Sequence, residues 1–407
     1  MNHDLIHDWN LAGDAPRRPS RRIEFDDETL RDGLQSPSAT SPTVDQKMEL
    51  LRLMDALGLD AADIGLPGAG GAVKEDTLAL ARGMAAEKLR IAPNCAARTL
   101  EADIRPIAEI VQKTGRPIQA ALFIGSSPIR QFAEDWTIEK ILEHTKSAVA
   151  FAVKQGLEVM YVTEDTTRAN PKDLERLFLA AVECGAKRLC LCDTCGHATP
   201  HGVAELVRFT RGLLDARKLG HVRIDFHGHM DRGLGVWNAV AALEAGADRV
   251  HGTALGIGER VGNAPMDQIL VNLKLLGWID NDLQRLYEYC LKSAEYVGIP
   301  IPHGYPVVGK DAFETATGVH AAAIIKAMKK GDAWLADRVY SGVPAGEFGR
   351  EQEIAIGPMS GRSNVVYWLE KRGLPATEGA IAAILARAKQ SSRLLLEPEI
   401  REALGRS

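Results

Sequence analysis

Short apolar segments alternate with longer amphipathic segments from residue 22 to about residue 275. Their length and their content of Val, Ile, Leu and Phe are typical of the buried strands of a parallel sheet. Eight such segments are present, at residues 22–27, 61–66, 89–94, 118–125, 158–163, 188–193, 222–227 and 249–255. Between them lie helical patterns such as 44–58 and 137–156, and each of these two ends on a glycine, as helices often do.

Eight strand–helix units in succession predict a (β/α)8 TIM barrel. A doubly wound open sheet is the alternative, but it is disfavoured because the count is eight and no G-x-G-x-x-G sequence follows the first strand. We assign residues 22–275 to the barrel. Residues 1–21 form an N-terminal tail that Pro16 and Pro19 interrupt.

The pattern changes after residue 275. Helical segments follow there, joined by a proline-rich connector at residues 300–309, and residues 377–390 again have a helical pattern. We therefore expect residues 276–407 to form a C-terminal helical accessory region.

The composition is that of an ordinary globular protein, with 45% hydrophobic residues, 25% charged residues and a formal net charge of −5. This charge gives no reason to expect nucleic acid or an anionic membrane as a partner. No apolar run approaches the roughly 18 residues of a membrane span, and the N-terminus lacks the apolar core of a signal peptide.

Three of the six cysteines cluster at Cys190, Cys192 and Cys195. The last two form a Cys-x-x-Cys pair, but no second pair completes a zinc site, and the surrounding residues are those of a buried strand. We expect a cytoplasmic protein with reduced thiols.

Polar residues gather at the carboxyl ends of the predicted strands, where barrel enzymes carry their active sites. His227 and His229, in "FHGHMDRGLG", are two residues apart on a strand, so their side chains project from the same face. Asp32 follows the first strand, which is next to the eighth in a closed barrel, and Asn263 follows the eighth. Taken singly, Asp32 could be a helix cap and Asn263 a turn residue. Together they suit a divalent metal ion such as zinc, manganese, magnesium or cobalt, with positions left open for substrate.

Arg31 stands directly before Asp32, where its guanidinium can stabilise an oxyanion that develops on a substrate. Gln35 can hydrogen-bond in the same region, although both residues could instead only brace the loop. Glu259 lies in the glycine-rich segment "GIGERVGNA" and can pair with Arg31 or with Arg260. We count Arg31 and Glu259 as candidate catalytic residues and Gln35 as a candidate substrate-binding residue.

Glu164 and Arg168 follow the fifth strand, and Thr194 follows the sixth. A cation near the mouth of the barrel suits a substrate that carries a carboxylate, and the Thr194 hydroxyl can bind the same ligand. These three residues are further candidates for substrate binding.

Five segments together resemble the metal-dependent Claisen-condensing barrels, namely 2-isopropylmalate synthase, homocitrate synthase and citramalate synthase. The segments are "DETLRDGLQSP", "TEDTTRANP", "DTCGHATP", "FHGHMDRGLG" and "GIGERVGNAP". The resemblance covers residues 23 to about 275, and it extends more loosely through "TATGVHAAAI" and residues 340–365.

The resemblance implies that acetyl-CoA, or a related acyl-CoA, condenses with a 2-oxo acid and that CoA is released. It implies a metal held by Asp32, His227, His229 and, in some members, Asn263, with Arg31 polarising the ketone. His320 matches a catalytic histidine that the second subunit of a homodimer supplies, and Tyr340 matches a tyrosine that assists it. That match implies two composite active sites in the dimer. It also implies that residues 276–407 act as a lid and dimerisation region.

The chain also departs from the family pattern. Leu34 replaces the glutamate of "RDGEQ" and resembles 3-hydroxy-3-methylglutaryl-CoA lyase, which runs a related reaction backwards. That lyase has a catalytic cysteine in the loop after strand eight, and "GIGERVGNA" has none. Met230 replaces the asparagine of the usual "HND", and Arg130, in "SSPIR", would add a substrate-binding cation that favours an anionic 2-oxo acid. The lyase type stays the alternative function, and an inactive metal-binding scaffold is disfavoured because Arg31 and the three metal ligands are intact.

Overall fold

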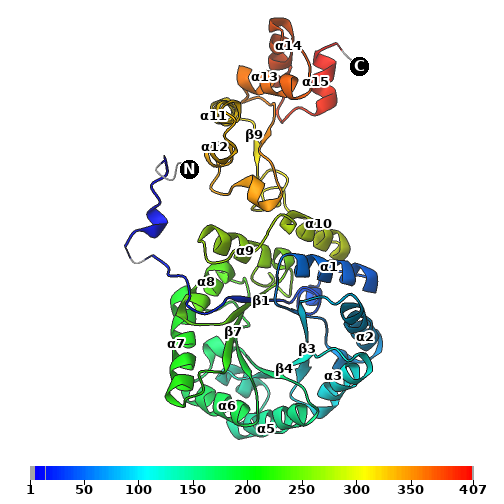
Figure 1. Ribbon diagram of the computed structural model, residues 1–407, viewed down its shortest axis with the longest axis vertical. Coiled ribbons are helices and arrows are strands. Elements are labelled where there is room, and N and C mark those ends of the chain that lie inside the picture. The colour runs from blue at the N-terminus through cyan, green and yellow to red at the C-terminus, as the bar shows by residue number, and fades with distance from the viewer. Residues whose placement is uncertain (1–4, 14, 406–407) are drawn as a thin grey trace. The chain divides into compact units, whose positions relative to one another are not determined.

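Eight parallel strands close into a barrel in the computed structural model of the chain, which describes residues 5–13 and 15–405 (Figure 1). The strands are β1 (Glu24–Asp27), β2 (Ala61–Asp63), β3 (Ala92–Arg98), β4 (Gln119–Gly125), β5 (Val159–Glu164), β6 (Arg188–Asp193), β7 (Arg223–Gly228) and β8 (Arg249–Gly252). Strands adjacent in sequence are adjacent in the sheet, and β1 closes the barrel by pairing with β8. The predicted TIM barrel is confirmed, and each of the eight predicted segments overlaps a strand.

The helices that follow the barrel strands form a ring around the barrel in Figure 1. They are α1 (Val44–Ala56), α2 (Gly71–Ala86), α3 (Glu101–Thr114), the short α4 (Pro128–Ala133), α5 (Ile138–Lys154), α6 (Pro171–Glu183), α7 (Pro200–Ala216), α8 (Gly235–Ala245) and α9 (Met266–Leu275). Helix α1 begins with a capping box, in which the Thr43 hydroxyl accepts from the Gln46 amide and the Gln46 side chain accepts from the Thr43 amide. The helical predictions for 44–58 and 137–156 are confirmed.

The third strand begins and ends later than the hydrophobic pattern predicts. It spans Ala92–Arg98, whereas the apolar segment at 89–94 predicts an earlier strand. Ile91 is fully buried just before the strand, and small residues such as Ala96 and Ala97 fill the strand itself. Alanine has a low β propensity, so these positions gave no strand signal.

The interior of the barrel is divided between two kinds of side chain. Strands β1, β7 and β8 and the residues just after them supply charged groups joined by ion pairs, and we call this the polar half: Asp26, Glu28, Asp225, Arg249 and His251. Strands β4, β5 and β6 supply a packed cluster that we call the apolar half: Ala121, Met160, Val162, Cys190 and Cys192.

The chain is divided into two compact units, Met1–Asp282 with Lys292–Ile299, and Leu283–Leu291 with Pro300–Ser407. Helix α10 (Leu286–Val297) contributes residues to both. The second unit is mainly helical, as predicted, with α11 (Gly318–Lys329), α12 (Ala333–Arg338), α13 (Arg362–Lys371), α14 (Glu378–Lys389) and α15 (Glu397–Ala403). Its apolar core includes Val365, Leu369 and Ile384. A parallel pair of two-residue strands, β9 (Glu314–Thr315) and β10 (Glu353–Ile354), was not predicted because two residues carry no alternation.

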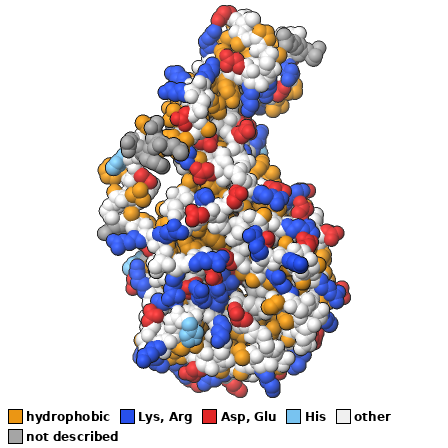
Figure 2. Space-filling model, viewed as in Figure 1, with side chains coloured by type: hydrophobic (Ala, Val, Ile, Leu, Met, Phe, Trp, Pro, Cys, Tyr) orange, Lys and Arg blue, Asp and Glu red, His pale blue; other side chains and the backbone are white. Residues whose placement is uncertain are grey.

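The predicted N-terminal tail contains a 3-10 turn at Trp9–Leu11, with Trp9 exposed. Arg21, at its end, pairs with Asp248. Residues 1–4 and 14 of the tail lie outside the described residues. Among the residues that the structure describes, no helix is both long and apolar enough to span a bilayer. Positive and negative side chains are interspersed on the face that Figure 2 shows.

Candidate active site

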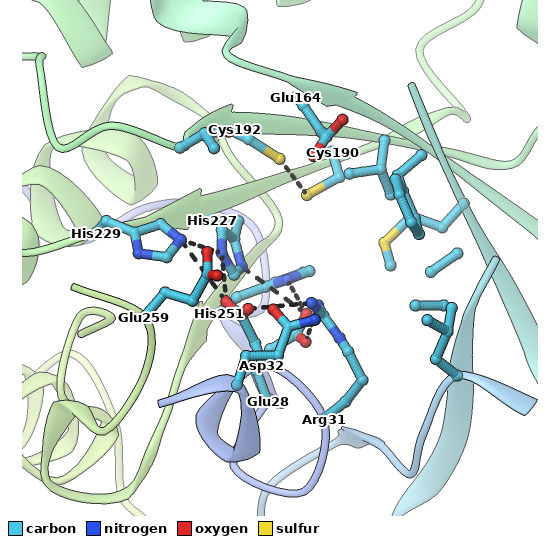
Figure 3. Close-up of a pocket in the computed structure, with 18 of the residues that line it drawn as sticks. Glu28, Arg31, Asp32, Glu164, Cys190, Cys192, His227, His229, His251 and Glu259 are labelled. Atoms are coloured by element: carbon cyan, nitrogen blue, oxygen red, sulfur yellow. Dashed lines mark hydrogen bonds and ion pairs between the residues drawn. The ribbon is translucent and has the colours of Figure 1, made fainter. Parts of the chain in front are cut away.

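A cavity lies at the carboxyl ends of the strands, where the predicted site residues were expected to meet. In Figure 3 the side chains of Asp32, His227 and His229 stand on one side of the cavity, and Cys190 and Cys192 stand on another. The predicted residues that line it are Arg31, Asp32, Gln35, Glu164, Thr194, His227, His229 and Glu259.

Asp32, His227 and His229 form a buried triad of possible metal-binding groups. The two Nε2 atoms lie 3.3 Å apart. Asp32 Oδ2 lies 3.3 Å from Nε2 of His227 and 3.6 Å from Nε2 of His229. Ligands at about 2.0–2.2 Å from one ion in tetrahedral geometry lie roughly 3.3–3.6 Å from each other. The triad therefore fits a single divalent ion.

Two buried oxygen atoms at this site, Asp32 Oδ2 and Asn263 Oδ1, accept no hydrogen bond from any residue that the structure describes. Leaving a buried acceptor without a partner costs free energy, and a bound cation removes that cost. Asn263 is fully buried and forms an isolated β-bridge with His229, so it is adjacent to the triad in the fold. Its ligation of a metal stays a prediction.

The protonation state of His229 suits a metal ligand. Burial and the neighbouring His227 lower the pKa of His229 to about 4. The ring is therefore neutral near pH 7, and a neutral imidazole is the form that binds a metal.

The loop after β8 is held in one conformation by Gly262. Its φ is +94°, and a Cβ added there would lie 1.7 Å from the carbonyl oxygen of Gly256. The Asn263 amide donates to that same carbonyl at 3.0 Å, and the Ala264 amide donates to Gly228 at the end of β7. The glycines of "GIGERVGNA" thus bring Asn263 against the strand end that carries the histidines.

Arg31 stands beside the triad and contacts three carboxylates. Its Nε donates to Asp63 at 2.9 Å, its Nη1 lies 3.2 Å from Asp32 Oδ1, and it also pairs with Glu28. Burial lowers the pKa of Arg31, but Glu28, Asp32 and Asp63 outweigh burial and raise it well above its usual value. A fixed positive charge therefore adjoins the triad. Glu259 pairs with Arg260, at 3.9 Å, which is one of the two alternatives that its sequence position allowed.

Glu28 and His251 belong to the site, and the sequence analysis did not single them out. Glu28 Oε1 lies 3.8 Å from Nδ1 of His227 and 3.0 Å from Nδ1 of His251. His251 Nε2 lies 3.2 Å from Asp225. A carboxylate behind a ligating histidine orients its ring. The available signals were a glutamate two residues after Asp26, on the same face of the extended chain, and a histidine inside an apolar strand.

The predicted substrate-binding residues are only partly gathered at the cavity. Burial raises the pKa of Glu164, and Arg130 lies 3.9 Å from it. The Thr194 hydroxyl accepts from the Asp165 amide at 2.8 Å. Arg168 donates to both oxygens of the Asp165 carboxylate, at 2.7 and 2.8 Å. Arg130 and Arg168 are not among the cavity-lining residues, so their substrate contacts stay predictions.

His320 and Tyr340 lie together in the second unit. Their rings are stacked with centroids 4.2 Å apart. His320 is exposed on α11, and Tyr340 is 48% exposed after α12. The two residues that were assigned one chemical role from the sequence are thus in direct contact with each other.

The closed barrel and its buried triad define the class: a metal-dependent enzyme of the (β/α)8-barrel type. The chain belongs to the HMGL-like family, whose family model matches residues 22–290. It is 34% identical to homocitrate synthase AksA of Methanopyrus kandleri over 367 residues, which cover 89% of this chain and 86% of that protein. A probable 2-isopropylmalate synthase of the same organism is 32% identical over 372 residues, covering 91% of this chain and 70% of that protein. The predicted resemblance to these synthases is confirmed.

Among solved structures, the HMG-CoA lyase of Bacillus subtilis superposes with a TM-score of 0.58 at 23% identity, covering 70% of this chain and 97% of that chain. At that identity the superposition supports the barrel fold and does not decide between synthase and lyase.

Proposed function

We propose that the protein condenses an acyl-CoA, most simply acetyl-CoA, with a 2-oxo acid to give a 2-hydroxy-2-alkyl dicarboxylic or tricarboxylic acid and CoA. The observation that carries this proposal is similarity over nearly the whole chain to relatives named homocitrate synthase and 2-isopropylmalate synthase. The lyase alternative is supported by fold similarity and by Leu34, and the glycine-rich loop after β8 lacks a cysteine.

The reaction has three balanced parts. A base removes a proton from the methyl group of the acetyl thioester. The resulting carbon nucleophile attacks the ketone carbon of the 2-oxo acid, so a C–C bond forms and the ketone oxygen takes up a proton. Water then cleaves the thioester and releases CoA as the thiol.

In this proposal Asp32, His227, His229 and Asn263 would hold a divalent ion, zinc, manganese, magnesium or cobalt. When bound, such an ion would supply Lewis-acid stabilisation of the charge that develops on the ketone oxygen. Arg31 adds a fixed positive charge next to the same position, supported by its 3.2 Å contact with Asp32. Glu28 lies behind the ring of His227, 3.8 Å from its Nδ1, and Glu259 is a further candidate catalytic group at the rim.

The base is His320, assisted by Tyr340, because an imidazole can accept a proton from a substrate and the two rings are in contact. We propose that both are supplied by the second subunit of a homodimer, with residues 276–407 as the lid and dimerisation region. Gln35, Glu164 and Thr194 would bind the 2-oxo acid, and Arg130 and Arg168 would contact the anionic parts of the substrates. The six free cysteines support a cytoplasmic location.

A thiol-release assay tests the function. The purified protein, a divalent metal and acetyl-CoA are mixed with pyruvate, 2-oxoisovalerate, 2-oxoglutarate or oxaloacetate in turn. We expect CoA release that depends on one or more of these acids and is lost in Asp32→Ala. No release with any of them would contradict the proposal, and cleavage of 3-hydroxy-3-methylglutaryl-CoA would favour the lyase type.

A further inference from the structure

The wall of the cavity across from the triad is apolar. Ala121, Met160, Cys190 and Cys192 form a buried cluster, with exposures of 5% or less, and Val162 packs against it. All five line the cavity, together with Leu66, Ala96 and Phe123. They come from the turn after β2 and from strands β3 to β6, whereas the triad comes from the segment after β1 and from the end of β7 with the residue that follows it. The cavity therefore lies between a charged side and an apolar side.

Each cationic group that lines the cavity already has anionic partners. Arg31 contacts Glu28, Asp32 and Asp63. Arg260 donates to both oxygens of Asp231, at 2.8 and 2.9 Å. His251 lies between Glu28 and Asp225.

Arg249, the cation that contacts the apolar half, is also paired with carboxylates. Arg249 donates to the sulfur of Met160 at 3.2 Å, and it pairs with Asp225 at 2.6 Å and with Asp26 at 3.2 Å. The loosely paired charges at the rim have the opposite sign: Glu164 and Glu259 each lie 3.9 Å from their arginine partners. A second substrate carboxylate placed against the apolar half would meet carboxylates and apolar groups, since the uncharged polar side chains of the lining, Gln35 and Thr194, lie outside that cluster.

We infer that the acceptor is a 2-oxo acid with an uncharged, apolar side chain. This inference rests on the proposed function. The ketone and the carboxylate of such an acid stand at one end of the molecule, and its side chain stands at the other. With the oxygen-bearing end at the triad, the side chain enters the apolar half. A second carboxylate there would lose its water without gaining a cation, which is strongly unfavourable. This inference differs from the sequence-based expectation that Arg130 favours an anionic acid, and the titrations described next decide between the two.

Two pairs of 2-oxo acids with side chains of similar size and shape distinguish the effect of side-chain charge on binding from the effect of side-chain size. Oxaloacetate matches 4-methyl-2-oxopentanoate, and 2-oxoglutarate matches 5-methyl-2-oxohexanoate, since a carboxylate is replaced by an isopropyl group of the same branching. Each acid is titrated by calorimetry into the Mn²⁺-loaded protein without acyl donor, and thiol release is measured with acetyl-CoA. We expect the apolar member of each pair to bind at least about a hundredfold more tightly, because the other member buries an unpaired charge.

A pair of matched variants locates the pocket. Ala96 and Ala92 stand four residues apart on β3, and Ala96 lines this cavity whereas Ala92 lies at the opposite end of the barrel. Ala96→Val should weaken the binding of 4-methyl-2-oxopentanoate by roughly tenfold or more and leave pyruvate within about twofold, since two methyl groups narrow a hydrophobic pocket. Ala92→Val should leave the binding of both acids unchanged.

The outcomes distinguish the two proposals. Equal or tighter binding of the dicarboxylic members, with acid-dependent thiol release, overturns the apolar acceptor and leaves the condensing function standing. Equal effects of the two alanine variants overturn the location of the pocket. Absence of binding and of thiol release with every acid overturns the proposed function, and the acceptor assignment with it.

Discussion

His227 lies between two carboxylates, with Asp32 at its Nε2 and Glu28 at its Nδ1. The ring is placed so that its Nε2 faces the other two members of the triad, 3.3 Å from Asp32 Oδ2 and 3.3 Å from His229 Nε2. Removing the imidazole takes away one of three converging donors, and two donors bind a divalent ion far more weakly than three.

We predict that His227→Ala lacks bound metal after purification and dialysis, measured by inductively coupled plasma mass spectrometry. Its circular dichroism should match that of the wild type, because the site lies at the rim of the barrel. His221→Ala, at an exposed position before β7, is the matched control and should retain the metal. Full occupancy in His227→Ala would refute the ligand assignment.

Arg31→Lys keeps the positive charge but loses the planar fork that reaches Asp63 through Nε and Asp32 through Nη1. We predict a fall in turnover of at least about a hundredfold, the scale for losing one oxyanion donor. Metal content should be unchanged. If turnover stays near the wild-type value, Arg31 only braces the loop.

At this scale the sequence was informative where residue spacing carried the signal. The two-residue spacing of His227 and His229 predicted their common face, and the order of strands predicted that Asp32 would be near them. Glu28 and His251 were missed because their roles depend on contacts between β1 and β8 that no local pattern encodes. The pairing of Arg168 with Asp165 is local, three residues apart around a 3-10 turn, and it was not predicted from the sequence.

Asp248 ties several elements of the barrel unit together at the end opposite the cavity. It precedes β8 and is fully buried, and it accepts from Arg211 on α7 at 2.6 Å, from Arg223 on β7 at 3.0 Å and from the Ile224 amide at 2.8 Å. Burial raises the pKa of Asp248, but the Ile224 amide and Arg211 outweigh burial, so the net pKa is below its usual value.

We predict that Asp248→Asn, which keeps the shape and removes the charge, lowers the free energy of unfolding by roughly 3–5 kcal/mol at pH 7. Because the native pKa is depressed, the contribution of the carboxylate is present above its unfolded pKa of about 4 and is lost as the pH falls below that value. The difference in the free energy of unfolding between wild type and variant, measured by urea titration, should therefore become smaller from pH 7 to pH 3.5. Asp215→Asn, at an exposed position, should unfold with the same free energy as the wild type. A difference for Asp248→Asn that does not change with pH would contradict the stabilising role of the Asp248 carboxylate.

The elements themselves were largely predictable, because strands buried on both faces read as apolar runs and the helices between them have an amphipathic period. The exceptions have physical causes. Strand β3 is built from small residues such as Ala96 and Ala97, whose burial comes from the barrel around them. Strands β9 and β10 exist only because two distant dipeptides pair.

For the whole molecule, the decisive question is which chain supplies His320 to a given barrel. We predict that mixing Asp32→Ala with His320→Ala, under conditions that allow subunit exchange, restores activity to roughly a quarter of wild type, since half the dimers would be mixed and each would carry one intact site. Each variant alone should be inactive. Native mass spectrometry verifies the exchange, and proven exchange without recovery would mean that both residues serve the same chain or that His320 is not the base.

The helical nature of residues 276–407 followed from their periodicity, but their assembly did not. A single chain carries no signal for a symmetric contact except the exposed chemistry that the contact would cover. His320 and Tyr340 could be paired in advance only through the family resemblance, because twenty residues separate them in the sequence and no strand or helix period relates them.

The charged and apolar side chains of the cavity lie on different strands. The residues inferred to contact the acceptor can therefore change independently of the metal-binding triad. With the acceptor placed as inferred, point changes on β3 to β6 would reshape the wall that meets it, while β1, β7 and the residues just after them would keep the metal-binding triad, so a new acceptor would not require a new catalytic centre. A library randomised at Ala96, Ala121 and Val162 would test that independence in the laboratory.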